Sequence, residues 1–284
     1  AGMVAAEFPQ VQLLALPRNI GFTAANNLAL AGLGFAATFP PDLHVHQAAA
    51  PPDHVLLLNP DAELTLGSLR QFMHVMERLP AAGIIGPYLQ YGDGRFQHGA
   101  FALPSLAQVA LDLFPLTGVR GAHRLHHSRL NGRYGRVLWE GAQPFAVDFV
   151  LGAAMFVRGA AIASTGGLDP QFWMYCEEMD WCLRMREAGW GVFAAPGVRV
   201  IHHEAQSSRQ VRWWAFKRLW QSRINFYAKH RRRFGPGYLP AVRALLRLGV
   251  MQRRRAVKAQ FARGAITGAS AQEALDALAA VAEL

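Results

Sequence analysis

Short apolar runs alternate with amphipathic segments along the first three quarters of the chain. The apolar runs predict strands at residues 11–16, 54–58, 83–89 and 192–201, and a strand or a strand pair broken by Gly152 at residues 147–157. Apolar residues at three- and four-residue spacing predict helices at residues 23–30, 66–79 and 175–188. We expect residues 98–146 to be rich in loops and the Ala-rich tail, residues 265–284, to be helical. Strands that alternate with helices are typical of an α/β fold.

The run His54–Leu58 predicts the centre of the sheet. It reads HVLLL, without the apolar–polar alternation of a strand that has one face in water. Such runs are typical of parallel strands that are buried on both faces. The run ends at Asn59, and ligands of open α/β sheets bind beside the carboxyl ends of strands.

The positive charge of the chain is concentrated near its C-terminus. The net charge of the 284 residues is +10. Residues 1–204 contain 13 basic and 16 acidic side chains, whereas residues 205–272 contain 16 basic side chains and no acidic one. We therefore predict a body of residues 1–208 and a basic amphipathic helical extension of residues 209–284.

Aromatic side chains are interleaved with the basic ones in this extension. Trp213, Phe216 and Trp220 recur at helical spacing between Arg and Lys residues. A basic amphipathic helix of this kind suits an anionic membrane surface. Packing of the aromatic side chains on the body is the alternative interpretation. Nucleic-acid binding is disfavoured, because none of its sequence signatures accompanies the charge.

Composition excludes several classes of protein. The 52% hydrophobic content with 17% charged residues excludes a disordered chain. No apolar run reaches the roughly 18 residues of a membrane span. Two cysteines, Cys176 and Cys182, do not make a disulfide framework, which favours a reducing, cytoplasmic compartment.

Two carboxylates follow the predicted central strand. Asp61 and Glu63 are separated by one residue in a turn that Pro60 stiffens. Carboxylates in this arrangement can bind a hard cation such as Mg²⁺ or Mn²⁺. A turn-forming role, or a capping role for the helix that follows, is the alternative.

Three more carboxylates crowd the first turn of the helix predicted at residues 175–188. Glu177 and Asp180 share a face that suits ion pairing along the helix, and Cys176 belongs to its apolar stripe. Glu178 lies off both faces, and its acidic neighbour can shift its pKa, as a general base requires. Stabilisation of the helix dipole is the purely structural alternative.

Two histidines end the last predicted strand. His202 and His203 are consecutive, so their side chains point to opposite faces. At most one of them therefore faces a site.

The order of these motifs resembles family 2 glycosyltransferases of the rhamnosyltransferase-like branch. The resemblance covers residues 8–230 in unbroken order. It is carried by the motifs NIGF (19–22), NN (26–27), LLNPDAEL (57–64), GP (86–87), DG (93–94), VD (147–148), LGAAM (151–155), GGLD (166–169), residues 172–184, GW (189–190) and HH (202–203). Any one of these motifs is weak, whereas the ensemble is highly specific.

The resemblance implies a GT-A fold, a Rossmann-like and mostly parallel central sheet flanked by helices. It implies that Asp61 binds a divalent cation, Mg²⁺ or Mn²⁺, with Glu63 and His202 as further ligands. Glu178 matches the family's catalytic base, which is usually Asp, and Glu177 is the second choice. The implied reaction is sugar transfer with inversion to an acceptor hydroxyl, with the cation neutralising the diphosphate that departs.

The resemblance also implies the substrates and the residues that line their sites. On the nucleotide-sugar side these are Asn19, Gly21, Asn27 and Asn59. On the acceptor side they are Asp148, Gly152 and Asp180. The donor would be a dTDP-, UDP- or GDP-sugar, with rhamnose suggested only by the branch. The acceptor would be a glycan or a lipid-linked sugar, reached from the cytoplasmic face of the membrane.

One departure from the family pattern concerns the start of the chain. Family members begin with a strand, a helix and a strand that ends in a Val-Asp-Asn-like motif, and nothing here matches it. We expect a fragment that lacks one βαβ unit, roughly 50 residues. Such a fragment would expose an apolar sheet edge and have little activity.

Two other functions remain open on the sequence alone. The body could be vestigial, with the basic extension binding acidic lipids or nucleic acid. Alternatively, Asp61, Glu63 and His202 could serve a metal-dependent phosphohydrolase.

Overall fold

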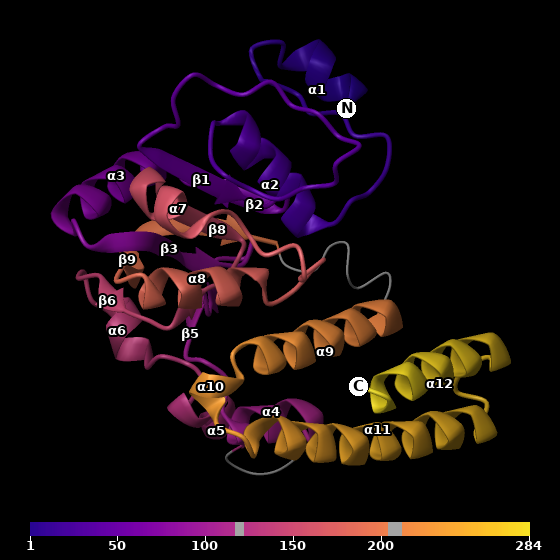
Figure 1. The fold of residues 1–284 in the computed structure, drawn as a ribbon. Helices are drawn as coiled ribbons and strands as arrows, with labels where there is room; N and C mark the ends of the chain where they lie inside the picture. Colours follow the sequence, from indigo (N-terminus) through magenta and orange to yellow (C-terminus); the bar gives the residue numbers. More distant parts are fainter. Residues whose placement is uncertain (117–121, 204–211) are drawn as a thin grey trace.

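The computed structural model describes residues 1–116, 122–203 and 212–284, and it has a central sheet with helices on both faces (Figure 1). Within the described residues the main sheet has seven strands, in the order β1-β8-β3-β9-β2, with β4 beside β3 and β6 beside β9. These strands are β1 (His54–Leu58), β2 (Ala62–Leu64), β3 (Ala82–Gln90), β4 (Phe96–Gln97), β6 (Phe145–Ala146), β8 (Ala154–Arg158) and β9 (Gly191–His202). A second, small sheet pairs β5 (Ala100–Phe101) with β7 (Phe149–Val150).

The pairing of the strands corrects the expected mostly parallel sheet. Among the described strand pairs only the β3–β9 pair is parallel. The pairs β1–β8, β3–β8, β2–β9, β3–β4 and β6–β9 are antiparallel. Strand β8 lies between β1 and β3 and runs antiparallel to both of them, which the alternation of predicted strands and helices does not reveal.

Strand β1 lies at the edge of this sheet and not at its centre. In the described residues it pairs only with β8, in the register Leu58↔Ala154. Leu57 is buried, whereas Leu58 is 41% exposed. The continuous apolar run predicted the strand correctly and its place in the sheet wrongly.

The strand predicted at residues 11–16 is absent from the structure. These residues form irregular backbone, and Val11, Leu13 and Leu14 are exposed. A strand requires a neighbour for its backbone hydrogen bonds, and no strand of the described chain lies beside this segment.

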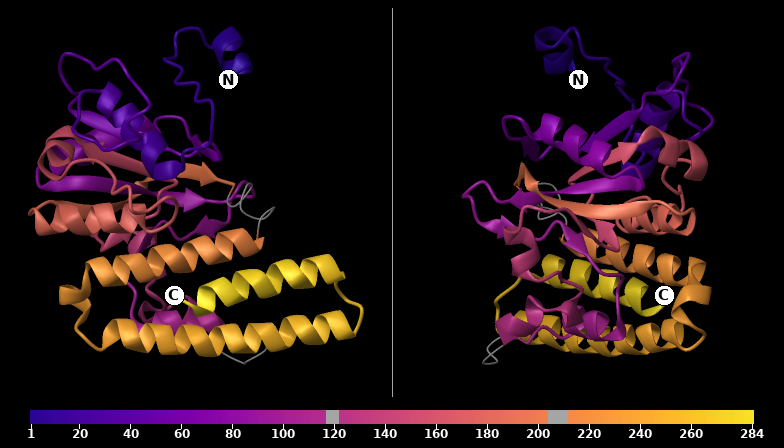
Figure 2. Two further views of the ribbon diagram at one scale, coloured as in Figure 1. Left: turned by 45° about the vertical axis from the view of Figure 1, so that its right-hand side comes forward. Right: turned by 90° about the vertical axis from the view of Figure 1, so that its left-hand side faces the viewer.

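Helices cover both faces of the sheet. On one face α3 packs Phe72 and Met76 onto Ile85. On the other face α7 and α8 pack around Ile84, whose side chain points the opposite way along β3. Further helices form a layer beyond α8 (Figure 2). The helices are α1 (Gly2–Glu7), α2 (Phe22–Gly32), α3 (Ser68–Arg78), α4 (Leu106–Leu113), α5 (Ala122–His126), the 3₁₀ helix η1 (Arg129–Asn131), α6 (Arg136–Glu140), α7 (Gly159–Thr165), α8 (Glu177–Glu187), α9 (Arg212–Lys229), α10 (Arg231–Phe234), α11 (Tyr238–Ala262) and α12 (Gly268–Ala282).

The C-terminal helices share a hydrophobic core with the body. Trp220 of α9 and Leu246 of α11 belong to the same buried cluster as Trp181 of α8 and Val150 of β7. Packing on the body therefore accounts for Trp220, whereas Trp213 remains half-buried. The predicted boundary between residues 208 and 209 lies outside the described residues.

Candidate active site

The carboxyl end of β1 and the start of β8 bring two of the predicted carboxylates to one region. The backbone N–H of Asn59 donates a hydrogen bond to the carbonyl of Ala153 at 2.9 Å. The preceding Gly152 lies against Glu178, since a Cβ at Gly152 would be 3.9 Å from the Glu178 Cβ. The segment 152–153 therefore lies between the turn that bears Asp61 and the helix that bears Glu178.

Asp61 and His202 face each other on neighbouring strands. In the β2–β9 register Ala62 lies opposite His202, and the His203 N–H donates to the Asp61 carbonyl at 2.9 Å. The His202 Nε2 is 3.5 Å from Asp61 Oδ1, and its Nδ1 is 3.0 Å from Gln97 Oε1. The contact with Gln97 holds the imidazole so that its Nε2 faces Asp61.

This pair fits a divalent cation. A carboxylate oxygen and an imidazole nitrogen, here 3.5 Å apart, are ligand types that Mn²⁺ and related ions accept. The orientation of the histidine by a hydrogen bond to its other nitrogen is typical of metal-binding histidines. Sequence reasoning missed Gln97, which lies on a two-residue strand and belongs to no motif.

Glu63 does not join this pair. Its Oε1 is 2.7 Å from His203 Nε2, and its carboxylate is 62% exposed. The two histidines thus point to opposite sides, as expected, and each has a different carboxylate beside it. In the described part of the chain, no group of three or more His, Cys, Asp or Glu side chains is placed to hold a metal ion.

The capping interpretation of Asp61 and Glu63 is also excluded. Helix α3 begins at Ser68, with Gly67 in the N-cap position. The Ser68 and Thr65 hydroxyls both donate to the Arg199 carbonyl, which ties this turn to β9.

The backbone immediately before α8 is strained. Tyr175 and Cys176 have φ angles of +69° and +67°, and no other described residue except glycine has a positive φ. Residues other than glycine adopt such positive φ angles at a cost of order 1–3 kcal/mol, and residues of this kind cluster at functional sites. The strained pair leads directly into Glu177 and Glu178, the first two residues of the helix.

Burial raises the pKa values of both glutamates. Each has one buried carboxylate oxygen, Oε2, without a hydrogen-bond partner. Desolvation raises the pKa of Glu178 to about 7. Desolvation, and then the charge of Glu178, raises the pKa of Glu177 well above its usual range. With a pKa of about 7, Glu178 can both take up and release a proton near neutral pH.

The N-terminus of α2 lies near Gly152, as Glu178 does. Asn19 Oδ1 accepts from the Gly21 N–H at 2.9 Å, and Gly21 begins the helix with a φ of +85°. A Cβ at Gly21 would lie 2.6 Å from the Trp173 indole, so only glycine fits here. The next residue, Phe22, reaches the neighbourhood of Gly152. Trp173 packs closely at this point, and no sequence signal singled it out.

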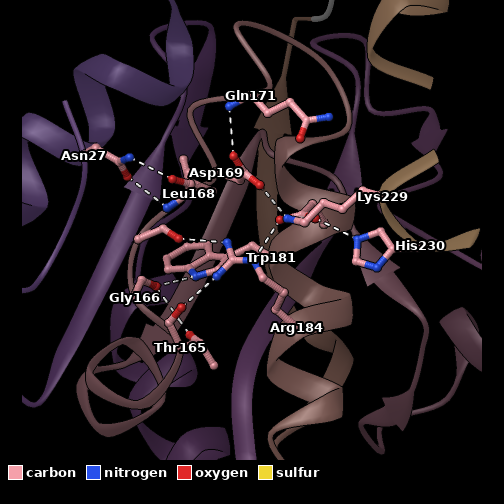
Figure 3. Close-up of polar contacts among 12 residues, drawn as sticks. Asn27, Thr165, Gly166, Leu168, Asp169, Gln171, Trp181, Arg184, Lys229 and His230 are labelled. Carbon is pink, nitrogen blue, oxygen red and sulfur yellow. Dashed lines mark hydrogen bonds and ion pairs between the residues drawn. The ribbon is translucent and has the colours of Figure 1, made fainter. Parts of the chain in front are cut away.

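Asn27 does not face a ligand. It is fully buried, and its side-chain nitrogen donates to the Thr38 carbonyl and to the Leu168 carbonyl at 2.7 Å each. Figure 3 shows the contacts with Leu168. Its oxygen accepts from the Leu168 N–H at 2.8 Å. Because these bonds use the amide fully, the geometry does not support a place on the nucleotide side. Asn27 instead holds α2 to the loop that follows α7.

Asp180 is likewise enclosed. It is fully buried, and its carboxylate binds Arg184 at 2.8 Å, Lys229 at 2.6 Å and His230 at 2.8 Å (Figure 3). Despite burial, these hydrogen bonds and charges lower the pKa of Asp180 to about 2. The predicted acceptor contact is therefore not supported, and Asp180 instead joins α8 to α9 and α10.

Asp148 also has a structural environment. Its Oδ1 binds Arg186 of α8 at 2.7 Å, and its Oδ2 accepts from the Leu103 N–H at 2.8 Å. Both oxygens are thus engaged, which leaves Gly152 as the predicted acceptor-side residue that lies beside Glu178.

Comparison with known proteins bears on this arrangement. No family profile matches the sequence. N-acetylglucosaminyl-diphospho-decaprenol L-rhamnosyltransferase from Mycobacterium tuberculosis (strain H37Rv) is 30% identical over 209 residues, which are 71% of this chain and 61% of that protein. The chain is a relative of the family 2 rhamnosyltransferases. It spans about three fifths of the length of this curated relative, as 61% coverage shows.

Other matches are more limited. Rhamnosyltransferase WbbL from Escherichia coli (strain K12) is 32% identical over 85 residues, 30% of this chain and 32% of that protein. The solved mannosyltransferase PcManGT from Pyrobaculum calidifontis, in complex with GDP-Man and Mn²⁺, aligns with 98% of this chain and 71% of its own at 14% identity and a TM-score of 0.46. The mixed α/β class expected for a rhamnosyltransferase relative is confirmed by the central sheet flanked by helices.

Proposed function

We propose that the protein is a glycosyltransferase that moves a sugar, with inversion, from a nucleotide diphosphate to an acceptor hydroxyl. The observation that carries the proposal is the segment 152–153, which is hydrogen-bonded to Asn59 in the turn that bears Asp61 and lies against Glu178. A cation ligand pair and a carboxylate that is half-ionised at neutral pH are the two groups that such a reaction needs.

Asp61 and His202 would hold Mg²⁺ or Mn²⁺. The bound cation supplies positive charge that neutralises the departing diphosphate. Gln97 orients His202 through the 3.0 Å contact at Nδ1. Glu63 is not needed as a ligand, since the donor diphosphate itself offers oxygen atoms to a hard cation.

Glu178 would act as the general base. Its carboxylate takes the proton of the acceptor hydroxyl while the hydroxyl oxygen forms a bond to the anomeric carbon. The bond from that carbon to the diphosphate oxygen breaks, and the electron pair departs with the diphosphate. A pKa of about 7 allows the base to be ionised at neutral pH and still strong enough to take a proton. Glu177, which is buried and whose pKa is raised well above its usual range, is the second candidate.

The names of the relatives support the proposed substrates. Both are called rhamnosyltransferases, and the mycobacterial one is named for a diphospho-decaprenol acceptor. We therefore propose a deoxyhexose such as rhamnose as the sugar, with a dTDP donor tested before UDP and GDP donors. We propose a lipid-linked sugar diphosphate as the acceptor, in the assembly of a cell-envelope polysaccharide.

We further propose attachment at the cytoplasmic face of an anionic membrane. No helix within the described ranges is both long and apolar enough to cross a bilayer. The 16 basic side chains of residues 205–272, unaccompanied by acidic ones, support a peripheral attachment by charge.

The test is a thermal-shift screen of nucleotide sugars with Mg²⁺ or Mn²⁺, followed by a transfer assay. It uses this chain and the longest open reading frame that contains it. A true donor stabilises the folded protein by mass action, and Asp61→Ala should abolish that shift. Hydrolysis of the donor without an acceptor, as fast as transfer, would instead identify a phosphohydrolase and refute the proposal.

A further inference from the structure

A groove runs between α9 and α11 and opens beside the strained turn before α8. Its volume is about 420 Å³, within the range of small-molecule sites. The lining includes Tyr175, Arg212, Trp213, Phe216, Arg253 and Val257. The site therefore combines aromatic and aliphatic side chains with two guanidinium groups.

The two guanidinium groups lie close enough to repel each other. Burial and then the charge of Arg212 lower the pKa of Arg253. Arg253 is fixed by hydrogen bonds to the carbonyls of Leu113 at 2.9 Å and Asp112 at 3.2 Å. The Asp112 carboxylate is itself bound by Arg223 at 2.8 Å. An anion in the groove would relieve the repulsion.

The rest of the groove suits an apolar chain. Arg253 lies over the Phe216 ring at 5.2 Å, and Arg212 over Trp213 at 5.5 Å. Each cation thus lies beside an aromatic face, and Leu219, Ala256 and Val257 complete the wall. This pairing of charge with apolar surface matches an amphiphile better than a free anion or a nucleic acid.

The groove also leads to the proposed base. Tyr175 lines it and lies three residues before Glu178 in the sequence. Its left-handed backbone turns the chain between the groove and the start of α8. A head group held at Arg212 and Arg253 would therefore have its attached sugar on the side of Tyr175 and Glu178.

We propose that the α9–α11 groove binds the diphosphate and the first apolar units of a lipid-linked acceptor. This inference rests on the proposed function, and it assigns the acceptor subsite. Arg212 and Arg253 bind the phosphate oxygens by charge-assisted hydrogen bonds, and Trp213, Phe216 and Val257 contact the lipid chain.

Calorimetry with farnesyl diphosphate, a soluble isoprenoid diphosphate, tests the assignment directly. EDTA is present, so that a metal-dependent donor site is silent. We expect Arg212→Glu, which reverses a charge, and Ala256→Trp, which fills the groove, each to weaken binding about tenfold or more. The matched controls are Arg232→Glu on α10 and Ala259→Trp on α11. Both are exposed and outside the groove lining, and they should leave Kd within about twofold.

Two competing ligands and one further variant complete the design. Inorganic pyrophosphate and a short-chain phosphatidylglycerol should each bind about tenfold more weakly than farnesyl diphosphate. Equal binding of either one, or equal effects of the groove and control variants, would overturn the assignment. Asp61→Ala should leave this binding unchanged. If the protein binds farnesyl diphosphate as expected but shows no sugar transfer, the proposed function is refuted and the assignment of the groove as a binding site stands.

Discussion

At the scale of single residues, the site depends on burial that the sequence does not reveal. The acidic cluster at the start of α8 was predicted, and Glu178 was favoured because it lies off both helix faces. Its pKa of about 7 comes from desolvation, and it follows two residues, Tyr175 and Cys176, that have positive φ angles. Neither property has a local sequence signal, because both are produced by packing from distant segments such as the loop at Gly152.

The raised pKa of Glu178 predicts a conflict between stability and activity. The pKa of Glu178 is about 7 in the folded state and near 4.5 in the unfolded state. The contribution of this carboxyl to stability is therefore fully present below pH 4.5 and is lost as the pH rises through 7. Glu178→Gln cannot ionise, so it should unfold at a higher temperature than the native protein at pH 8, by at least about 2 °C.

Thermal melts of both proteins between pH 4 and pH 8 check this prediction. The difference in melting temperature should grow as the pH rises. A difference that is constant, or that shrinks, would mean that Glu178 is not buried as described.

Asn27 provides a contrasting prediction, since its side chain is fully used inside the protein. Asn27→Ala removes three hydrogen bonds and leaves buried backbone groups unpaired, so it should lower the free energy of unfolding by about 3 kcal/mol. Asn26→Ala, which loses one half-buried bond to the Phe22 carbonyl, is the matched control. Denaturant titration gives both values. If Asn27→Ala instead kept its stability and weakened donor binding, the nucleotide-side role expected from the family would be restored.

At the scale of elements, the ion network of Asp180 connects α8 to the helical layer. Arg184 on α8 also donates to the carbonyls of Thr165 and Gly167 at 2.8 Å each, so the network extends to the loop after α7. The i, i+4 pairing of Asp180 with Arg184 was foreseeable from their spacing. Lys229 and His230 were not, because they lie about 50 residues away in the sequence.

Asp180→Asn should therefore be a stability variant. The pKa of Asp180 is lowered to about 2, so its contribution is present above pH 3.8 and is lost as pH falls through 2. Breaking a buried ion pair leaves its partners uncompensated, and we expect a loss of about 3–5 kcal/mol at pH 7. Urea unfolding at pH 7 and at pH 3 measures this loss. The difference in the free energy of unfolding between the native protein and the variant should be smaller at pH 3. An unchanged gap would indicate that the charge of Asp180 is not the source of the effect.

The strands show how far local pattern determines a fold. The predicted strands at residues 54–58, 83–89 and 192–201 exist, because each apolar run is buried on at least one side. Their partners and directions depend on which other segments are near. Hence the apolar run of β1 is found at an edge, and residues 11–16 form no strand.

At the scale of the whole molecule, basic side chains near the C-terminus form a positively charged surface on the helical layer. Arg254 and Arg255 of α11 are exposed and line a small pocket of about 260 Å³ with Arg247 and Lys258. The composition predicted basic amphipathic helices correctly. It left open whether the aromatic side chains pack on the body, and this is decided by Trp220 and Leu246, which join the core of α8.

This surface should bind anionic vesicles by charge. We expect Arg254→Gln with Arg255→Gln to weaken binding to phosphatidylglycerol vesicles roughly 30-fold, because each basic residue contributes about 1 kcal/mol near such a surface. Arg70→Gln with Arg78→Gln, two exposed arginines of α3, is the control of equal charge. Vesicle co-sedimentation at low and high salt measures both. Equal loss in the two double variants would show that net charge, and not this surface, is responsible.

The most direct test of the account is the pH dependence of kcat/KM for sugar transfer to a lipid-linked acceptor. We predict a rate that rises with pH to a plateau, with an apparent pKa near 7. Glu178→Gln should lower kcat by about 10²–10⁴ and remove this ionisation, whereas Asp61→Asn should lower the rate without moving it. A profile in which Glu178→Gln retains both the rate and the apparent pKa would contradict the assignment of Glu178 as the base.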